Sequence, residues 1–318
     1  MWVGALGILV FGGPFLFWDA LVTMPLHEHL QTAAREFGNY LKDYLGTWPF
    51  FLCLGVVFTL EATLPASRSQ RLLSTGLRHD FVLAGPTLLY WFFALPFFLA
   101  PLSLLLQRYS PSIQVVNLGG SPAYISWPLA FLLQDLLLWV SHYLRHKIPL
   151  LWHFHALHHS QMELNMFSEF RAHPLDLVAS QLLIGVPLYM IAVPAHTIVA
   201  LLIGQKWFLM LLHANVRTNL GILGHLVVSP VFHRLHHSSA PQHTDVNFGV
   251  YLSIWDRLFG TRQDPAVEEP FATGVMGYPI EQECRWQETA GVYVRQLLYP
   301  FEILIKDPSR AWCQGQRS

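Results

Sequence analysis

Charged residues are scarce in this chain. Only 12% of its 318 residues are Asp, Glu, Lys or Arg, whereas an ordinary globular protein has about 25%. The 19 basic and 20 acidic residues leave a formal net charge of −1, which gives no argument for nucleic-acid binding, since that would require a basic face. Hydrophobic residues make up 53% of the chain, so the composition indicates a membrane protein with apolar partners.

Cysteine is scarce too. The three cysteines, Cys53, Cys284 and Cys313, are far apart and include no Cys-x-x-Cys pair, so the sequence supports neither a disulfide framework nor a thiolate metal site. No G-x-G-x-x-G motif follows a predicted strand, and no haem or flavin motif is present. Any redox chemistry would therefore need an electron carrier on a separate partner.

Long apolar runs dominate the rest of the sequence. A membrane-spanning helix needs about 20 apolar residues. Four runs approach that length, at residues 2–24, 48–64, 81–106 and 127–140. The first lacks the basic start and cleavage site of a signal peptide, and we expect it to be retained.

A fifth run, residues 175–212, is roughly twice as long as one crossing. Pro187 and Pro194 near its middle predict that it folds back as a helical hairpin. The fold class we predict is an all-α integral membrane protein, a transmembrane helical bundle of about four spans plus this hairpin.

The loop between the second and third runs carries Arg68, Arg71 and Arg78. Basic loops usually stay on the cytoplasmic side, so we place this loop there. Counting spans then puts the end of the fourth run and both ends of the hairpin on the same side. Since the histidines lie at these ends, the sequence predicts a cytosolic, histidine-rich cap.

Histidines cluster at spacings that suit metal binding. Two lie four residues apart at the end of the fourth run, two H-x-x-H-H groups follow, and a single histidine ends the hairpin. On helices, residues three and four apart share a face. One structural zinc would use only four ligands, so nine candidates indicate two ions. The candidates are His142, His146, His155, His158, His159, His213, His233, His236 and His237.

Ligand imidazoles usually donate their second ring N–H to a fixed acceptor. Asp135 lies seven residues before His142, two helical turns back on the same face, and we expect it to accept from a ligand imidazole. Asn215 follows His213 by two residues and is expected to orient it. Asp245 and Asn247 come shortly after the last cluster and are further candidates of this kind.

Three other histidines are weaker candidates. His173 stands beside Arg171 at the mouth of the hairpin, where the pair could bind a headgroup or a hydroxyl group, or where His173 could simply lie in the membrane interface. His243 could extend the site beyond the last cluster. His153 lies about 200° around a helix from His155, so it is expected to point away from the metals.

Five segments together resemble the fatty acid hydroxylase / sterol desaturase superfamily of integral-membrane di-iron oxygenases. They occur in family order between about residues 130 and 262, as DLLLWVSHYLRH, LWHFHALHHS, LLHANV, SPVFHRLHHS and DVNFGVYLSIWDRLFGT. The resemblance divides the chain into N-terminal transmembrane helices at 1–126, a di-iron domain at 127–262 and a polar C-terminal cap or tail at 263–318.

The resemblance implies a fatty acid hydroxylase-like enzyme in which the same nine histidines bind two iron ions. Such an enzyme uses O₂ to hydroxylate or desaturate a C–H bond of a lipid, here a sterol or fatty-acyl type substrate, with no catalytic residues apart from the ligands. Its electrons would come from NAD(P)H through a b-type cytochrome, or through a ferredoxin and its reductase. Its membrane would be the endoplasmic reticulum in a eukaryote or the inner membrane in a bacterium.

The alternative is a membrane metal-binding or metal-transport protein without oxygenase activity. Transporters place their ion ligands near the middle of the membrane, between broken helices. In this sequence the histidines lie at the ends of the apolar runs and beyond them. Their position therefore favours the enzyme.

Overall fold

The computed structural model describes residues 48–94, 117–191, 195–265, 272–275, 277–278 and 288–306, with residues 31, 34, 35, 108 and 109. Within these ranges the chain is helical, and its β-type pairing is limited to three isolated bridges. This confirms the all-α class. The first predicted span, residues 2–24, lies outside the described residues.

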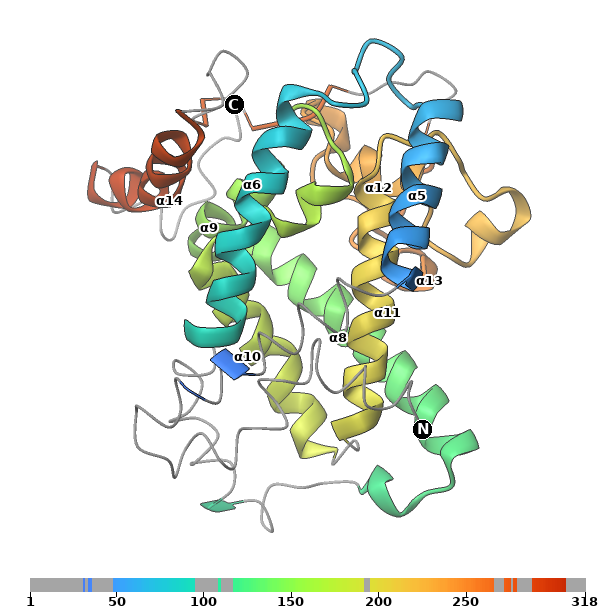
Figure 1. The fold of residues 1–318 in the computed structure, drawn as a ribbon. Coiled ribbons are helices and arrows are strands. Elements are labelled where there is room, and N and C mark those ends of the chain that lie inside the picture. Colours follow the sequence, from blue (N-terminus) through green and yellow to red (C-terminus); the bar gives the residue numbers. More distant parts are fainter. Residues whose placement is uncertain are drawn as a thin grey trace.

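Three long helices form the centre of the molecule: α8 (Ala123–Lys147), α10 (Pro174–Met190) and α11 (Ala195–His213). Helices α5 (Trp48–Thr63) and α6 (Thr75–Leu89) lie beside them, as Figure 1 shows. The short helices α9 (Pro149–His159) and α12 (Pro230–His236) lie near the C-terminal end of α8.

A buried apolar core joins the central helices. It includes Leu138 of α8, Leu188 of α10, Leu212 of α11 and Phe232 of α12. Burying a side chain of this size contributes roughly 1.5–3 kcal/mol. The core therefore fixes α8, α11 and α12, three of the helices that carry histidines, relative to one another.

Among the described residues, α8 is the one helix that is both long and apolar enough to cross a membrane. Residues 51–63 and α10 are apolar but shorter. The number of spans therefore stays a prediction. The third predicted run, residues 81–106, begins inside a helix and not at its start, because Ser74 caps α6 by accepting from the Leu77 N–H at 3.1 Å.

The chain leaves the histidines at the start of α10, where Asp176 contacts His155, and returns to them at the end of α11, where His213 contacts His158, as the hairpin prediction required. The predicted role of Pro187 is wrong, since this residue lies inside α10 and the helix continues to Met190. A proline removes only one helical hydrogen bond, and the surrounding helices can hold the rest. Pro194 lies outside the described residues.

A sharp turn between α8 and α9 brings the histidines of α8 opposite the histidines of α9. Ile148 ends α8 in an extended conformation, with φ −91° and ψ 114°. The residue before a proline disfavours helix, and Pro149 then occupies the first position of α9, where no N–H is needed. The dipeptide thus ends one helix and starts the next.

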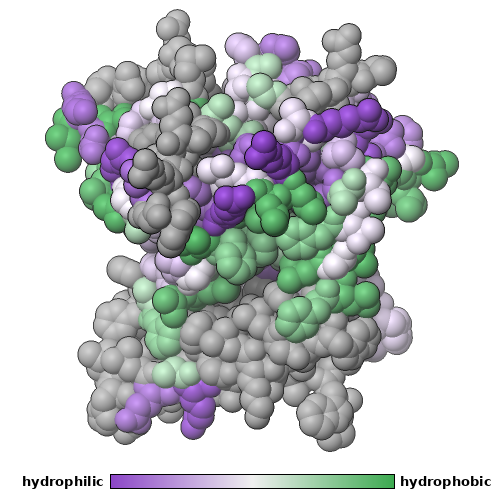
Figure 2. All heavy atoms as spheres, turned by 45° about the horizontal axis from the view of Figure 1, so that its top comes forward, coloured by the Kyte–Doolittle hydropathy of each residue, from purple (hydrophilic) through white to green (hydrophobic). Residues whose placement is uncertain are grey.

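Hydrophilic and hydrophobic residues separate on the surface. Figure 2 shows hydrophilic side chains over the upper part of the molecule and a hydrophobic band below them. Exposed apolar side chains on α5, α6, α8 and α10 include Phe51, Phe81, Leu132 and Leu182. Apolar surface of this extent is typical of contact with lipid or with another protein.

Candidate metal centre

All nine predicted ligand histidines meet in one place. Two come from α8, three from α9, one from the end of α11 and three from α12 and its C-cap. Eight of the rings are buried, and His158 is half-buried. Spacing along the sequence predicted each local group, and the fold brings the groups together.

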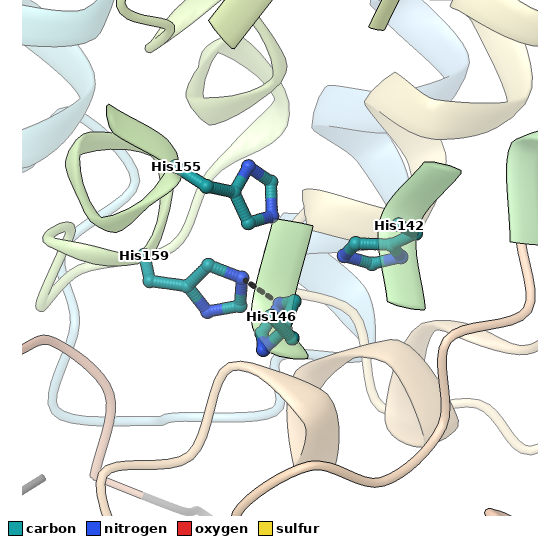
Figure 3. Close-up of side chains that lie close together, drawn as sticks. All are labelled: His142, His146, His155 and His159. Carbon is teal, nitrogen blue, oxygen red and sulfur yellow. Dashed lines mark hydrogen bonds between the residues drawn. The ribbon is translucent and has the colours of Figure 1, made fainter. Parts of the chain in front are cut away.

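The first group consists of His142, His146, His155 and His159. One ring nitrogen from each lies within 4.8 Å of the others. Figure 3 shows these rings turned toward a common centre, with the Nε2 atoms of His146 and His159 3.1 Å apart. Four imidazoles around one point is a donor set that suits a first-row transition metal.

The second group consists of His158, His213, His233 and His237, again with one nitrogen each within 4.8 Å of the others. The Nε2 atom of His213 lies 3.1 Å from Nε2 of His158 and 3.1 Å from Nε2 of His233. The lone histidine of the hairpin therefore sits at the centre of this group.

The two groups adjoin each other through His236. With His159 and His237, this residue forms a third, overlapping set of converging nitrogens. The ring centroids of His236 and His142 are 4.4 Å apart, and those of His159 and His237 are 4.2 Å apart. Two adjoining sets of converging nitrogens could hold two neighbouring ions, and His236 lies where the sets meet.

The chemistry of the buried nitrogens fits metal ions. Within the described residues, Nε2 of His236 and both ring nitrogens of His237 have no hydrogen-bond partner. Leaving such a buried polar atom unsatisfied costs roughly 1–3 kcal/mol. A cation at the centre of each group would satisfy nitrogens that the protein itself does not.

Burial also keeps these rings in the form that binds metal. Desolvation lowers the pKa of His236 to about 4, against the opposing effect of the Val246 carbonyl and Asp245. Burial, and then the neighbouring imidazoles, lower the pKa values of His233 and His237 well below the usual value. At neutral pH these imidazoles are uncharged and have a lone pair available.

Backbone carbonyls fix the tautomer of several rings. The Nδ1 of His142 donates to the Phe248 carbonyl at 3.0 Å, and the Nδ1 of His236 donates to the Val246 carbonyl at 2.7 Å. Because Nδ1 holds the proton, Nε2 is left as the ligand atom. The same role falls to the Arg171 carbonyl for His158, at 3.3 Å, and to the Leu209 carbonyl for His213, at 2.8 Å.

Two carboxylates that no sequence pattern singled out lie beside ligand rings. Asp176 Oδ2 lies 3.1 Å from Nδ1 of His155 and 3.1 Å from the Arg145 guanidinium. Glu169 Oε2 lies 3.6 Å from Nδ1 of His213, and its other oxygen pairs with Lys206. Each carboxylate is itself neutralised by a basic residue, so it is held in place.

The structure corrects the expected role of Asp135. Its carboxylate accepts from the backbone N–H groups of Tyr251 and Leu252, at 3.0 and 3.1 Å, and from the Trp255 indole at 2.9 Å. Residues 251–255 pack against α8 and donate these three hydrogen bonds, so the Asp135 carboxylate is not hydrogen-bonded to a ligand histidine. Asp135 therefore anchors this segment and orients no ligand directly.

Asn215 is corrected in the same way. Its backbone N–H donates to Glu61 at 2.8 Å, and its amide exchanges hydrogen bonds with the backbone of Ser67. It faces the loop after α5 and makes no hydrogen bond to His213.

Asn247 and Asp245 differ in outcome. Asn247 adopts a left-handed conformation, φ 59°, and its amide donates to the carbonyls of Phe232 and Gln263, so it shapes the turn. Asp245 does reach the cluster, with Oδ1 3.6 Å from His146 Nδ1 and Oδ2 2.7 Å from Lys147 Nζ.

The weaker candidates lie apart from the metal groups. His173 caps α10 by accepting from the Leu175 N–H at 3.0 Å, and its other nitrogen donates to the Leu297 carbonyl at 3.1 Å. His243 is hydrogen-bonded to Ser238 at 2.9 Å. None of the potential metal groups in the described part of the chain includes His153, His173 or His243.

Of the two alternatives for the His173–Arg171 pair, the position of Arg171 does not favour headgroup binding. Its side chain is fully buried and forms an ion pair with Asp80 of α6 at 2.8 Å. A second nitrogen donates to Gln296 at 3.1 Å. The Arg171 carbonyl accepts from His158, and the Arg171 side chain is held by Asp80 and Gln296. Residues of two helices outside the metal centre therefore support the second metal group.

Asp256 is a further residue without a predicted role. Its carboxylate accepts from the Phe248 and Gly249 N–H groups, at 2.8 and 2.7 Å, and from the Trp139 indole at 3.0 Å. It thereby fixes the turn whose Phe248 carbonyl holds His142. The helix of this residue, α13 (Ile254–Leu258), ends before Gly260, which has the left-handed φ of 72° expected for a helix stop.

A comparison with protein-family models identifies the part of the chain that carries this site. Residues 127–261 match the model of the fatty acid hydroxylase family. This part of the chain is a fatty acid hydroxylase domain. It contains all nine histidines of the metal centre, and the resemblance drawn from the sequence motifs is confirmed.

Two curated relatives indicate what this domain does elsewhere. Ornithine lipid hydroxylase OlsE of Rhizobium tropici is 29% identical over 204 residues, which cover 60% of this chain and 59% of that protein. Alkylglycerol monooxygenase of Homo sapiens is 32% identical over 139 residues, 43% of this chain and 30% of that protein. The matches thus span less than two thirds of either relative. No solved structure matches the chain significantly.

Proposed function

We propose that the protein is an O₂-dependent, membrane-bound di-iron oxidoreductase that hydroxylates a C–H bond of a lipid. The observation that carries the proposal is the meeting of two four-histidine groups inside a fatty acid hydroxylase domain. Both relatives named above are lipid oxygenases by name, which favours hydroxylation over desaturation. Neither name supports the sterol substrate that the sequence analysis included.

One iron would be held by the first histidine group and one by the second, with His236 available to either. Bound iron would supply O₂ activation and the oxidising power to break an unactivated C–H bond. The protein's own contribution is to hold the ligand rings neutral and in one tautomer, through the Phe248 and Val246 carbonyls and the Asp176 carboxylate.

We further propose that the histidine-bearing end of α8 faces the cytosol in a multi-pass protein. The last turn of α8 carries Arg145 and Lys147, and basic residues at a span end favour the cytoplasmic side. This orientation would place the metals within reach of a soluble or membrane-anchored electron carrier fed by NAD(P)H.

Metal analysis of the purified full chain tests the metal assignment. The proposal expects about two irons per chain by elemental analysis. A preparation that holds one stoichiometric zinc and no iron would contradict it. The competing metal-transport function would be favoured if the protein bound iron and carried it across the membrane of a vesicle but formed no lipid product.

Lipid profiling of an expressing host tests the reaction. We expect lipids heavier by one oxygen atom, formed only when O₂ is supplied. His236→Ala and His158→Ala should abolish the product. His225→Ala is the matched control, because this exposed histidine contacts Arg257 and lies outside the metal groups. Full turnover by the His236 or His158 variant would show that the ligand assignment is wrong.

A further inference from the structure

Helix α14 (Thr289–Lys306) has three distinct faces and lies at one side of the bundle (Figure 1). Its inward face carries Val292, Gln296 and Pro300, all buried. These residues follow one another at intervals of four, as one face of a helix requires. The helix is therefore a packed element of the fold.

The outward face of α14 is an apolar stripe. Val294, Leu298, Phe301 and Ile305 recur at intervals of four, three and four residues, and all are exposed. Leu298 is 51% exposed and Ile305 80% exposed. We call these four residues the α14 stripe. Single exposed apolar residues need no explanation, but a continuous exposed stripe indicates a partner.

Polar residues occupy the flank between the stripe and the buried face. Arg295, Glu302 and Lys306 lie on this side of the helix, and Glu302 and Lys306 form an exposed ion pair at 3.8 Å. A helix with one apolar face and one charged face suits the boundary between lipid and water. The remaining face, with Val292, Gln296 and Pro300, packs against the protein.

Hydrogen bonds fix the direction in which the stripe points. Gln296 accepts from the Arg171 guanidinium at 3.1 Å, and its carbonyl accepts from the Tyr278 hydroxyl at 3.0 Å. The Leu297 carbonyl accepts from His173 at 3.1 Å. These contacts hold α14 in one orientation. Val294, Leu298 and Ile305 therefore point away from the bundle, while Phe301 lies at the edge of the stripe and also touches the bundle.

The stripe continues the apolar surface of a central helix. Phe301 packs against Phe154 and against His173, with ring centroids 5.5 and 5.8 Å apart. His173 caps α10, whose Leu175 and Leu182 are exposed on its apolar surface. The α14 stripe therefore meets the end of α10 nearest the histidines.

A second exposed apolar patch lies on the other side of the bundle. It combines η5 (Gly221–His225) with α13, and its exposed residues include Ile222, Leu223, Leu226 and Leu258. Ile222 is 85% exposed. Figure 1 places α13 and α14 on opposite sides of the bundle, with α14 level with α9 and α13 somewhat lower than α12.

We propose that the α14 stripe and the η5–α13 patch both lie in the lipid surface on the histidine side of the membrane. The partner is the bilayer itself. A plane of lipid surrounds the bundle and can meet two patches on opposite sides, whereas one docked protein or one second copy would cover only one. The inference rests on the proposed membrane location of the enzyme.

Depth-dependent fluorescence quenching tests this inference. In the iron-loaded full chain, with its three native cysteines replaced by serine, Leu298→Cys and Ile222→Cys would each carry a bimane label in lipid vesicles. We expect a nitroxide placed near the lipid headgroup to quench both labels at least about twofold more than one placed near the chain end, because interfacial elements enter only the outer part of the leaflet.

Two control sites separate the possible outcomes. A label at Leu132→Cys, on the exposed apolar surface of α8, reports membrane insertion, and a label at Glu302→Cys reports the polar flank of α14. Quenching at 132 but not at 298 and 222 would overturn the inference and leave the proposed membrane location intact. Quenching at none of these sites would overturn both. Labels at 298 and 222 that neither lipid nitroxides nor aqueous iodide can reach would show that protein covers the patches.

Discussion

The carboxylates of this site have different roles, and their hydrogen-bond partners show which role each one has. Asp176 touches a ligand ring directly, whereas Asp135 and Asp256 hold backbone N–H groups of the segment that supplies the Phe248 carbonyl. Substitution of the first should act on metal affinity. Substitution of the others should act on the stability of the fold.

Asp176→Asn is expected to weaken iron binding roughly 10–100-fold, because loss of a carboxylate behind a ligand histidine typically has this effect. The amide keeps the size of the side chain but can no longer neutralise Arg145 or fix the His155 proton. Iron content under a graded chelator measures the effect. Asp264→Asn is the control, since this carboxylate is exposed and pairs with Arg262 outside the metal groups.

Asp135→Asn should behave differently. The carboxylate accepts three hydrogen bonds, from Tyr251, Leu252 and Trp255, and an amide would turn an N–H group toward at least one donor. The expected loss is roughly 1–3 kcal/mol of folding stability. Thermal unfolding with iron bound would report it. If the variant kept its stability but bound iron much more weakly, the result would instead support the direct contact with a ligand histidine that the sequence predicted.

At the scale of elements, short turns do most of the positioning. The turn at residues 245–249 supplies the carbonyls that hold His142 and His236, and two of its residues have positive φ. Asp and Asn tolerate this conformation better than other side chains with a Cβ, which explains Asp245 and Asn247 there.

Gly249→Ala tests this turn. A Cβ at this position would lie 2.8 Å from Asp256 Oδ2 and 2.9 Å from the Leu252 carbonyl, so the backbone would have to move. We expect a loss of roughly 1–3 kcal/mol of stability together with reduced iron occupancy.

Gly85→Ala in α6 is the matched control for that substitution, because nothing lies within 4 Å of its Cβ position. In a helix this change should be neutral or stabilise by roughly 0.5–1 kcal/mol. If both alanine variants behaved alike in thermal unfolding and iron content, the turn would not have the positioning role assigned to it.

The sequence predicted those parts of the structure that depend on local spacing. The histidine groups on α8, α9 and α12 follow from intervals of three and four residues, and the α10–α11 hairpin follows from run length. Most of the long-range polar contacts around the metal centre were missed. Asp80 and Arg171 are 91 residues apart, and the Asp135 carboxylate meets a backbone 116 residues away, so no local pattern could pair them.

In the C-terminal region too, the sequence predicted only part of what the structure shows. The sequence predicted a polar cap or tail for residues 263–318, yet α14 has an exposed apolar stripe and a buried face that holds Arg171. Average polarity hides a helix whose apolar residues occupy only one side. Helical periodicity over residues 289–306 was the signal that could have revealed it.

At the scale of the whole molecule, the metals would link four helices across the chain. The candidate ligands come from residues 142 to 237, so bound ions would hold α8, α9, α11 and α12 together. Removing iron with a chelator should lower the unfolding temperature, since a ligand at about 1,000 times its dissociation constant stabilises by about 4 kcal/mol. Thermal unfolding before and after chelation, and after iron is restored, measures this. An unfolding temperature unaffected by chelation would show that the ions do not bridge the helices.

The two groups of rings become complete at different moments of synthesis. The last residue of the first group is His159, so all four of its side chains exist before α10 and α11 have been made. The second group needs His213, His233 and His237, and it can close only after both arms of the hairpin have been produced and have folded back. A nascent polypeptide emerging from the ribosome would therefore acquire its first ion early and its second late. In a partly folded chain the late site is the one that is missing, because it depends on closing the longer loop.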